Sequence, residues 1–187
     1  TADFARLSLG YAVALLEKES DLARAAAVVM ALLQGQDTRP NAPTRGYFRW
    51  DTASSSGFER TTLWYAAPLM ARLYTAHRTR LGEECTQRVK AAMELAVKAL
   101  ERRDPNYPRE DELVRHAALA QLGNALGETR YASQAVGAVE RWLQGVAKAG
   151  RQWRPGAGGD TLRLLALQQV WQVAPEGLRE PVEQALR

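Results

Sequence analysis

Hydrophobic residues recur every three to four positions through most of the chain, which is the spacing of one face of an α-helix. Turn-forming residues interrupt this pattern at intervals and divide it into helical segments. We expect helices over residues 3–17, 20–36, 58–80, 83–102, 110–126, 128–149, 160–172 and 175–187. Few stretches alternate with a period of two, so the pattern predicts an all-α fold.

The joins between these helices alternate in length. Short joins lie at residues 18–20, 81–82, 126–127 and 174–175, and long joins lie at 37–57, 104–109 and 150–159. Because consecutive antiparallel helices place alternate connections at opposite ends, we expect the long loops to gather on one face. The helical pairs begin about every 50 residues, closer to HEAT-type repeats than to tetratricopeptide or ankyrin repeats, so a solenoid is an alternative. The long helices favour antiparallel hairpins in a toroid-like or superhelical array that forms part of a ring.

Local signals refine these helices. Ser20 is a suitable N-cap for the second helix, and Pro68 predicts a kink within the third. Trp64, Trp142 and Trp171 follow helical apolar stripes and are expected in the core.

Length and composition indicate one globular domain over residues 1–187, or a segment of a larger protein. Hydrophobic residues make up 46% of the chain and charged residues 25%, as in ordinary globular proteins. The net charge of +4 comes from 25 basic and 21 acidic residues that are interspersed, so it does not point to nucleic acid. Cys85 is the sole cysteine, which excludes an internal disulfide.

No targeting segment or membrane span is expected. The chain has no run of 18 apolar residues, and it starts at Thr1 without the basic-then-apolar pattern of a signal peptide. We expect a mature or trimmed chain. The two histidines, His77 and His116, are expected at opposite ends of the helices, so neither a metal site nor a cofactor is predicted.

Aromatic residues and arginines occur together in the long loops. The aromatic residues are Tyr47, Phe48, Trp50, Tyr107 and Trp153, and the neighbouring arginines are Arg45, Arg49 and Arg154. An aromatic ring can stack on the apolar face of a sugar, and a guanidinium group can bind hydroxyl or carboxylate groups. The alternative is that these aromatic rings fold back and close the end of the helical array.

Candidate catalytic groups lie near the same loops. Asp37 and Asp51 are the carboxylates least easily explained as helix caps, and paired carboxylates carry out glycoside hydrolysis. His116 is expected near the start of its helix, where it could act as a general base together with Tyr107. A structural role is the alternative for each of these residues.

The helical pattern resembles the α/α-toroid domains of heparinase II/III-like and alginate-lyase-like enzymes. The local similarities are Gln36-Asp37-Thr38, the stretch Gly46-Tyr47-Phe48-Arg49-Trp50, and Leu126-Gly127-Glu128 followed by Tyr131. This resemblance implies an acidic polysaccharide as ligand. In a lyase of this kind, His116 and Tyr107 would form the acid/base pair that acts beside a neutralised uronate carboxylate.

We therefore expect a carbohydrate-binding or carbohydrate-processing domain for an acidic polysaccharide, with catalysis as a lyase or a glycoside hydrolase left open. The alternative is a non-enzymatic helical-repeat module that binds a protein partner. A homo-oligomer or further domains would complete the ring. The carbohydrate interpretation favours the periplasm or the exterior of the cell.

Overall fold

The computed structural model describes residues 4–49, 57–102, 112–149 and 159–186. The chain divides into two compact units, which we call the N-terminal unit (Thr1–Arg102) and the C-terminal unit (Arg103–Arg187). Compactness does not show that either unit folds alone, so the expectation of one domain stays a prediction. Each unit is described separately.

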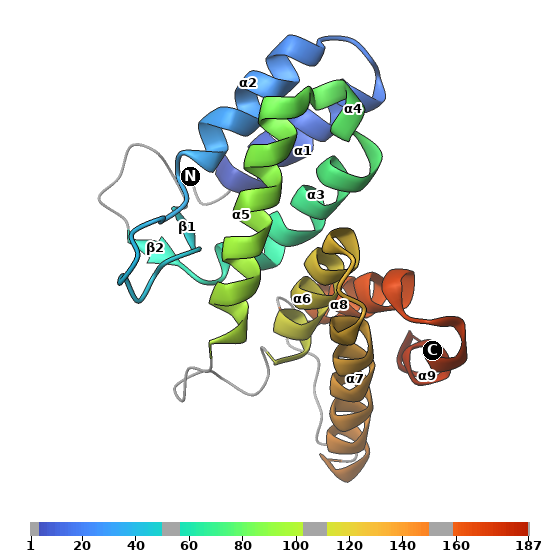
Figure 1. The fold of residues 1–187 in the computed structure, drawn as a ribbon. Coiled ribbons are helices and arrows are strands. Elements are labelled where there is room, and N and C mark those ends of the chain that lie inside the picture. The colour runs from blue at the N-terminus through green and yellow to red at the C-terminus, as the bar shows by residue number, and fades with distance from the viewer. Residues whose placement is uncertain (1–3, 50–56, 103–111, 150–158, 187) are drawn as a thin grey trace. The chain divides into compact units, whose positions relative to one another are not determined.

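The N-terminal unit consists of helices and one small hairpin of strands (Figure 1). Its elements are α1 (Phe4–Glu17), α2 (Leu22–Leu33), β1 (Phe48–Arg49), β2 (Phe58–Glu59), α3 (Thr62–Ala76), α4 (Arg78–Leu81) and α5 (Glu83–Glu101). Helices α1 and α2 form one hairpin, and α3 and α5 form another. The hairpins pack side by side, with α1 against α3 and α2 against α5. Each of these four helices therefore packs against two of the others, and the short α4 also contacts α2, α3 and α5.

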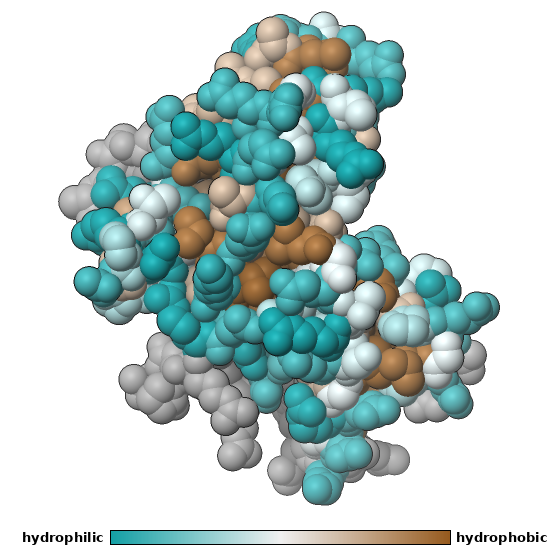
Figure 2. Space-filling view, in the orientation of Figure 1, coloured by the Kyte–Doolittle hydropathy of each residue, from teal (hydrophilic) through white to brown (hydrophobic). Residues whose placement is uncertain are grey.

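Small side chains bring these helices close together. Ala12, Ala67 and Ala96 are fully buried, and the larger residues Leu16 and Met93 fill the space between them. Cys85 is also buried, and burial raises the pKa of its thiol above the usual value, which keeps the thiol protonated and inert. On the face that Figure 2 shows, hydrophilic side chains surround several apolar patches.

Two local predictions for this unit are corrected. The N-cap of α2 is Asp21, whose carboxylate accepts a hydrogen bond from the backbone N–H of Arg24 at 2.9 Å, and not Ser20. The single helix expected over residues 58–80 is divided, because α3 begins at Thr62 and His77 separates it from α4; Pro68 lies inside α3, and the kink expected there stays a prediction.

The C-terminal unit repeats the same pattern of neighbours. Its elements are α6 (Glu112–Leu126), α7 (Arg130–Ala149), α8 (Gly159–Val173), the short 3₁₀ helix η3 (Glu176–Leu178) and α9 (Glu180–Leu186). Helix α6 pairs with α7 and α8 with α9, while α6 packs on α8 and α7 on α9. Two hairpins thus lie side by side in each unit.

The described residues confirm the all-α class and the positions of the tight turns. Gly82 and Gly127 adopt φ values of +76° and +83°, which other residues rarely reach, and each glycine ends a helix. In the described parts of the chain, the strands are the two-residue pair β1 and β2. The loops at 104–109 and 150–159 lie almost entirely outside the described residues, so the expected gathering of long loops stays a prediction.

No helix among the described residues is both long enough and apolar enough to cross a bilayer. This finding agrees with the prediction that the chain holds no membrane span.

Substitution of Gly123 tests how closely α6 packs on α7. A Cβ atom at this position would lie 2.4 Å from the ring of the buried Tyr131 and 2.9 Å from the carbonyl oxygen of Glu128. We expect Gly123→Ala to lower the free energy of unfolding by about 1–3 kcal/mol, because the ring and the turn must both shift.

Gly145→Ala is the matched control for Gly123→Ala. Nothing lies within 4 Å of a Cβ atom at Gly145, which is also in a helix. Alanine there should leave stability unchanged or raise it by up to about 1 kcal/mol. Urea denaturation followed by circular dichroism measures both variants, and equal stability of the two would contradict the close packing of α6 on α7.

Candidate functional site

The segment that follows α2 forms a closed loop, which we define as residues 34–49. Its two ends pair through the backbone: the N–H of Asp37 donates to the carbonyl of Tyr47 at 2.9 Å, and the N–H of Gly46 donates to the carbonyl of Asp37 at 2.7 Å. The N–H of Arg49 also donates to the carbonyl of Gly35 at 3.3 Å. These bonds fix the base of the loop.

Asp37 holds the interior of this loop together. Its side chain is fully buried and accepts hydrogen bonds from Nε and Nη2 of Arg39 at 2.9 and 2.8 Å. The hydroxyl group of Thr44 donates to the same carboxylate at 2.6 Å, and the backbone N–H of Arg39 donates at 3.1 Å. The hydrogen bonds from Arg39 hold the pKa of Asp37 well below its usual range, against the opposing effect of burial.

The loop is attached to the middle of α5 by two contacts. The side-chain amide of Gln36 donates to the carbonyls of Gly46 and Ala92, each at 3.0 Å. Gly46 itself lies so close to α5 that a Cβ atom would be 2.5 Å from the carbonyl oxygen of Leu95 and 2.7 Å from Cβ of Ala99. Gly46 also has a φ of +94°, so both its conformation and its surroundings require glycine.

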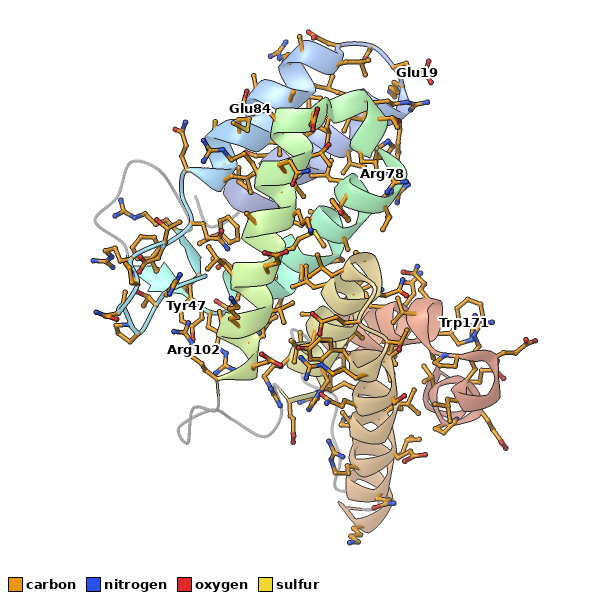
Figure 3. The ribbon with its side chains drawn as sticks, in the orientation of Figure 1. Glu19, Tyr47, Arg78, Glu84, Arg102 and Trp171 are labelled. Atoms are coloured by element: carbon orange, nitrogen blue, oxygen red, sulfur yellow. The ribbon has the colours of Figure 1, made fainter. Side chains whose placement is uncertain are left out.

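Arginine side chains lie over the aromatic rings at the edge of the loop. The guanidinium carbons of Arg49 and Arg39 lie 4.7 and 5.4 Å from the centre of the Phe58 ring. Arg102, just after α5, lies 5.5 Å from the centre of the Tyr47 ring, and Figure 3 shows these two side chains together beside the loop. Distances of this size are typical of cation–π contacts. We call residues 34–49 with Phe58 and Arg102 the arginine–aromatic loop.

Three guanidinium groups of the arginine–aromatic loop have no carboxylate partner among the described residues. Arg45 donates to the carbonyl of Pro40 at 3.2 Å, and Arg102 donates to the carbonyls of Arg45 and Ala42. Arg49 is exposed and contacts Phe58. The charge of Arg39, in contrast, is compensated by Asp37. The surface of the loop is therefore positively charged and suited to an anion.

The structure brings together four of the predicted site residues in this loop, namely Asp37, Arg45, Tyr47 and Arg49. Tyr47 is half-buried, and Phe48 beside it is buried in the core. The remaining candidates outside His116 lie beyond the described residues, and their roles stay predictions: Trp50, Asp51, Tyr107, Trp153 and Arg154.

His116 belongs to the C-terminal unit, within a cluster of charged side chains. Nη2 of Arg115 lies 3.0 Å from Nε2 of His116, and a carboxylate oxygen of Glu112 lies 3.6 Å from the same nitrogen. Arg141 of α7 approaches Glu112 at 3.8 Å. Burial, followed by the charge of Arg115, lowers the pKa of His116 to about 4, so the imidazole is neutral at pH 7.

The hydrogen bond from Arg115 limits what His116 can do as a base. Arginine only donates, so Nε2 accepts and the imidazole proton lies on Nδ1. Nδ1 is buried and has no hydrogen-bond partner among the described residues. The lone pair that a general base needs is therefore already engaged. Because Tyr107 lies outside the described residues, the predicted acid/base pair stays a prediction.

Sequence analysis did not identify Arg39, Thr44, Phe58 or Arg102 as parts of this site. The spacing of Asp37 and Arg39 is a usable signal, because a carboxylate and a cation two residues apart can pair within a turn. No signal in the sequence relates Arg102 to Tyr47, since 55 positions separate them in the numbering and their contact depends on the path of α5.

Comparisons of the chain with protein-family models, with curated proteins and with solved structures gave no significant match.

The contribution of the Asp37 carboxylate to the loop can be tested by measuring the free energy of unfolding. We expect Asp37→Asn to lower the free energy of unfolding by about 2 kcal/mol, because an amide cannot form the ion pair with Arg39 or accept all of the present hydrogen bonds. Asp21→Asn is the matched control, since asparagine caps a helix as well as aspartate does. Chemical denaturation at pH 7 measures both variants, and an equal effect of the two would contradict the role given to Asp37.

The depressed pKa of His116 predicts that acid destabilises the chain. Between its ordinary pKa of 6.5 and the folded value of about 4, the unfolded chain binds more protons at His116 than the folded chain does. The free energy of unfolding should therefore fall as pH falls through this window, by up to about 3 kcal/mol. His77 is also buried with a lowered pKa, owing first to burial and then to Arg80, so it adds a loss of the same sign.

Denaturation of the parent chain and of His116→Gln from pH 7 to pH 4 separates this contribution from that of other groups. The difference between the two curves should shrink as pH falls, because the variant lacks the titrating imidazole. A difference that is constant over this range would show that His116 keeps an ordinary pKa in the folded chain.

Proposed function

We propose that this chain binds an acidic polysaccharide through the arginine–aromatic loop. One observation carries the proposal: the guanidinium groups of Arg49 and Arg102 lie over the rings of Phe58 and Tyr47, and neither these groups nor that of Arg45 has a carboxylate partner among the described residues. Guanidinium groups bind uronate carboxylates through paired hydrogen bonds, and aromatic rings contact the apolar face of a sugar.

The fixed conformation of the arginine–aromatic loop supports this proposal. Backbone pairing, the Asp37 interactions and the contacts of Gly46 with α5 already hold the loop in place. A ligand that meets a preformed surface loses less binding free energy to ordering of side chains and backbone. Trp50, Trp153 and Arg154 stay predicted ligand-binding residues.

The described residues favour binding over catalysis. Asp37 is fully buried and ion-paired, whereas the general acid of a glycoside hydrolase needs a raised pKa and access to the substrate. His116 has its Nε2 lone pair engaged by Arg115. If this chain processes its ligand, as a lyase or a hydrolase, the chemistry depends on Asp51 or Tyr107.

We also propose that the hairpins belong to an α/α array of the toroid-like or superhelical kind. The support is the shared pattern of neighbours, in which corresponding helices of successive hairpins pack together in both units. Such arrays place their connecting loops at the ends of the helices, where the arginine–aromatic loop lies within the N-terminal unit.

A second candidate function is that of a helical module that binds a protein partner. The observation that favours it is a set of exposed apolar side chains on α8, where Leu164 is 54% exposed, Leu165 41% and Trp171 38%. Exposed apolar side chains are common at protein interfaces.

The glycan proposal is tested by calorimetric titration with an alginate oligosaccharide and with a neutral cello-oligosaccharide of the same length. We expect binding of the acidic ligand and weaker or no binding of the neutral one. Arg49→Gln should weaken binding of the acidic ligand about fivefold, the equivalent of about 1 kcal/mol for an exposed charge pair.

Lys18→Gln is the control for Arg49→Gln, because it removes the same charge from the exposed turn between α1 and α2. Equal weakening by the two substitutions would mean that binding follows net charge and not the loop. Absence of any binding to the acidic ligand would overturn the glycan proposal and leave the protein-binding module as the better candidate.

A further inference from the structure

A groove lies between α2 and α5 in the N-terminal unit, beside the arginine–aromatic loop. Its volume is about 340 Å³, within the range of about 300–1,000 Å³ that is typical of small-molecule sites. Met30 and Leu33 form the wall on α2, and Ala91, Ala92 and Leu95 form the wall on α5. The groove therefore has an apolar wall on each helix, and polar side chains complete its lining.

The groove is open because the facing side chains of α5 are short. Helices α2 and α5 are neighbours, yet methyl groups at Ala91 and Ala92 leave the space next to Leu33 unfilled. Ala91 is exposed, and Met30, Leu33 and Leu95 are half-buried, so apolar surface faces solvent here. Figure 2 shows apolar surface between hydrophilic side chains over α2 and α5. A ligand that covers this surface is stabilised by removal of apolar area from water.

One charged side chain, that of Arg88, lines the groove among the described residues. Of the described residues that line it, Arg88 alone is charged, and its neighbours at the other end are the neutral Gln34, Gln36 and Thr38. Arg88 is exposed and forms no ion pair with another described residue. Arg88, Ala91 and Leu95 are spaced by three and four residues, so they lie in a row along one face of α5.

We propose that this groove binds a small amphipathic carboxylate. The alkyl chain lies along Ala91 and Leu95 against the α2 wall, and the carboxylate accepts hydrogen bonds from the guanidinium group of Arg88. The apolar walls account for the alkyl chain, and the unpaired cation at one end accounts for the negative head group. The groove adjoins the arginine–aromatic loop, since Gln34, Gln36 and Thr38 line it, but Arg88 and the apolar walls lie outside that loop, and the proposal does not depend on the proposed function.

The first test is titration of the full chain with octanoate, followed through the NMR signals of the Met30 and Ala91 methyl groups. We expect these methyl signals to shift with octanoate. Octanol should bind about tenfold more weakly, and octylamine, whose cation is repelled by Arg88, should not bind. Failure of octanoate to shift either methyl signal would overturn the proposal, as would equal binding of octylamine.

Two variants locate the ligand within the groove. Arg88→Gln should weaken octanoate binding about tenfold, to the level of octanol. Ala91→Leu should abolish binding, because the larger side chain fills the groove from an exposed helical position where leucine costs little stability. An unfolding midpoint equal to that of the parent chain shows that a variant is folded.

Lys98→Gln is the matched control for Arg88→Gln. It removes a charge from the same helix, ten residues or about 15 Å further along, and Lys98 does not line the groove. Octanoate should bind this variant as it binds the parent chain. Equal weakening by the two charge substitutions, or unchanged binding to folded Ala91→Leu, would place octanoate elsewhere and refute the proposed site.

Discussion

The short side chains of α5 determine how closely the rest of the N-terminal unit approaches this helix. The backbone at Gly46 lies against Leu95 and Ala99 at a distance that leaves no room for a Cβ atom. The amide of Gln36 reaches the carbonyl of Ala92, which a larger neighbouring side chain would cover. The arginine–aromatic loop therefore depends on Ala92 and Ala99 of α5, and the open groove depends on Ala91 and Ala92. One helix face thus accounts for both candidate binding surfaces.

Burial separates the ionisable groups of this protein into two classes. Asp37, His77 and His116 are buried, and their pKa values are shifted in the direction that burial or a fixed partner requires. These groups contribute to the pH dependence of stability, and water does not reach them freely. Arg49 and Arg88 are exposed, and neither forms an ion pair with a described residue. A ligand from solution reaches the second class first, which is why both proposals rest on exposed arginines.

Periodic helices could be predicted from the sequence because each one repeats the same local pattern. The helix expected over residues 83–102 is found at Glu83–Glu101, and the turn at Gly127 lies in the short join expected at residues 126–127. The features that the sequence did not predict depend on tertiary contacts. The helix expected over residues 58–80 is divided at His77, and Trp171 is exposed although it lies in an apolar stripe. In the site, the sequence indicated Asp37 as a candidate. Its structural role, however, depends on hydrogen bonds from Arg39 and Thr44, and these contacts within a loop cannot be predicted from helical periodicity.

The length of the loop after α2 has a physical explanation that bears on what it recognises. The chain must leave α2, cross α5 near Ala92 and Ala99, and return to begin α3. The crossing is secured by Phe48, which is 1% exposed, so this aromatic residue serves as an anchor. Tyr47 is half-buried with Arg102 over its ring, which leaves the guanidinium groups as the main contact surface of the described loop. Recognition through such a surface follows the charge and spacing of the anionic groups on a ligand more than the stereochemistry of its sugar rings.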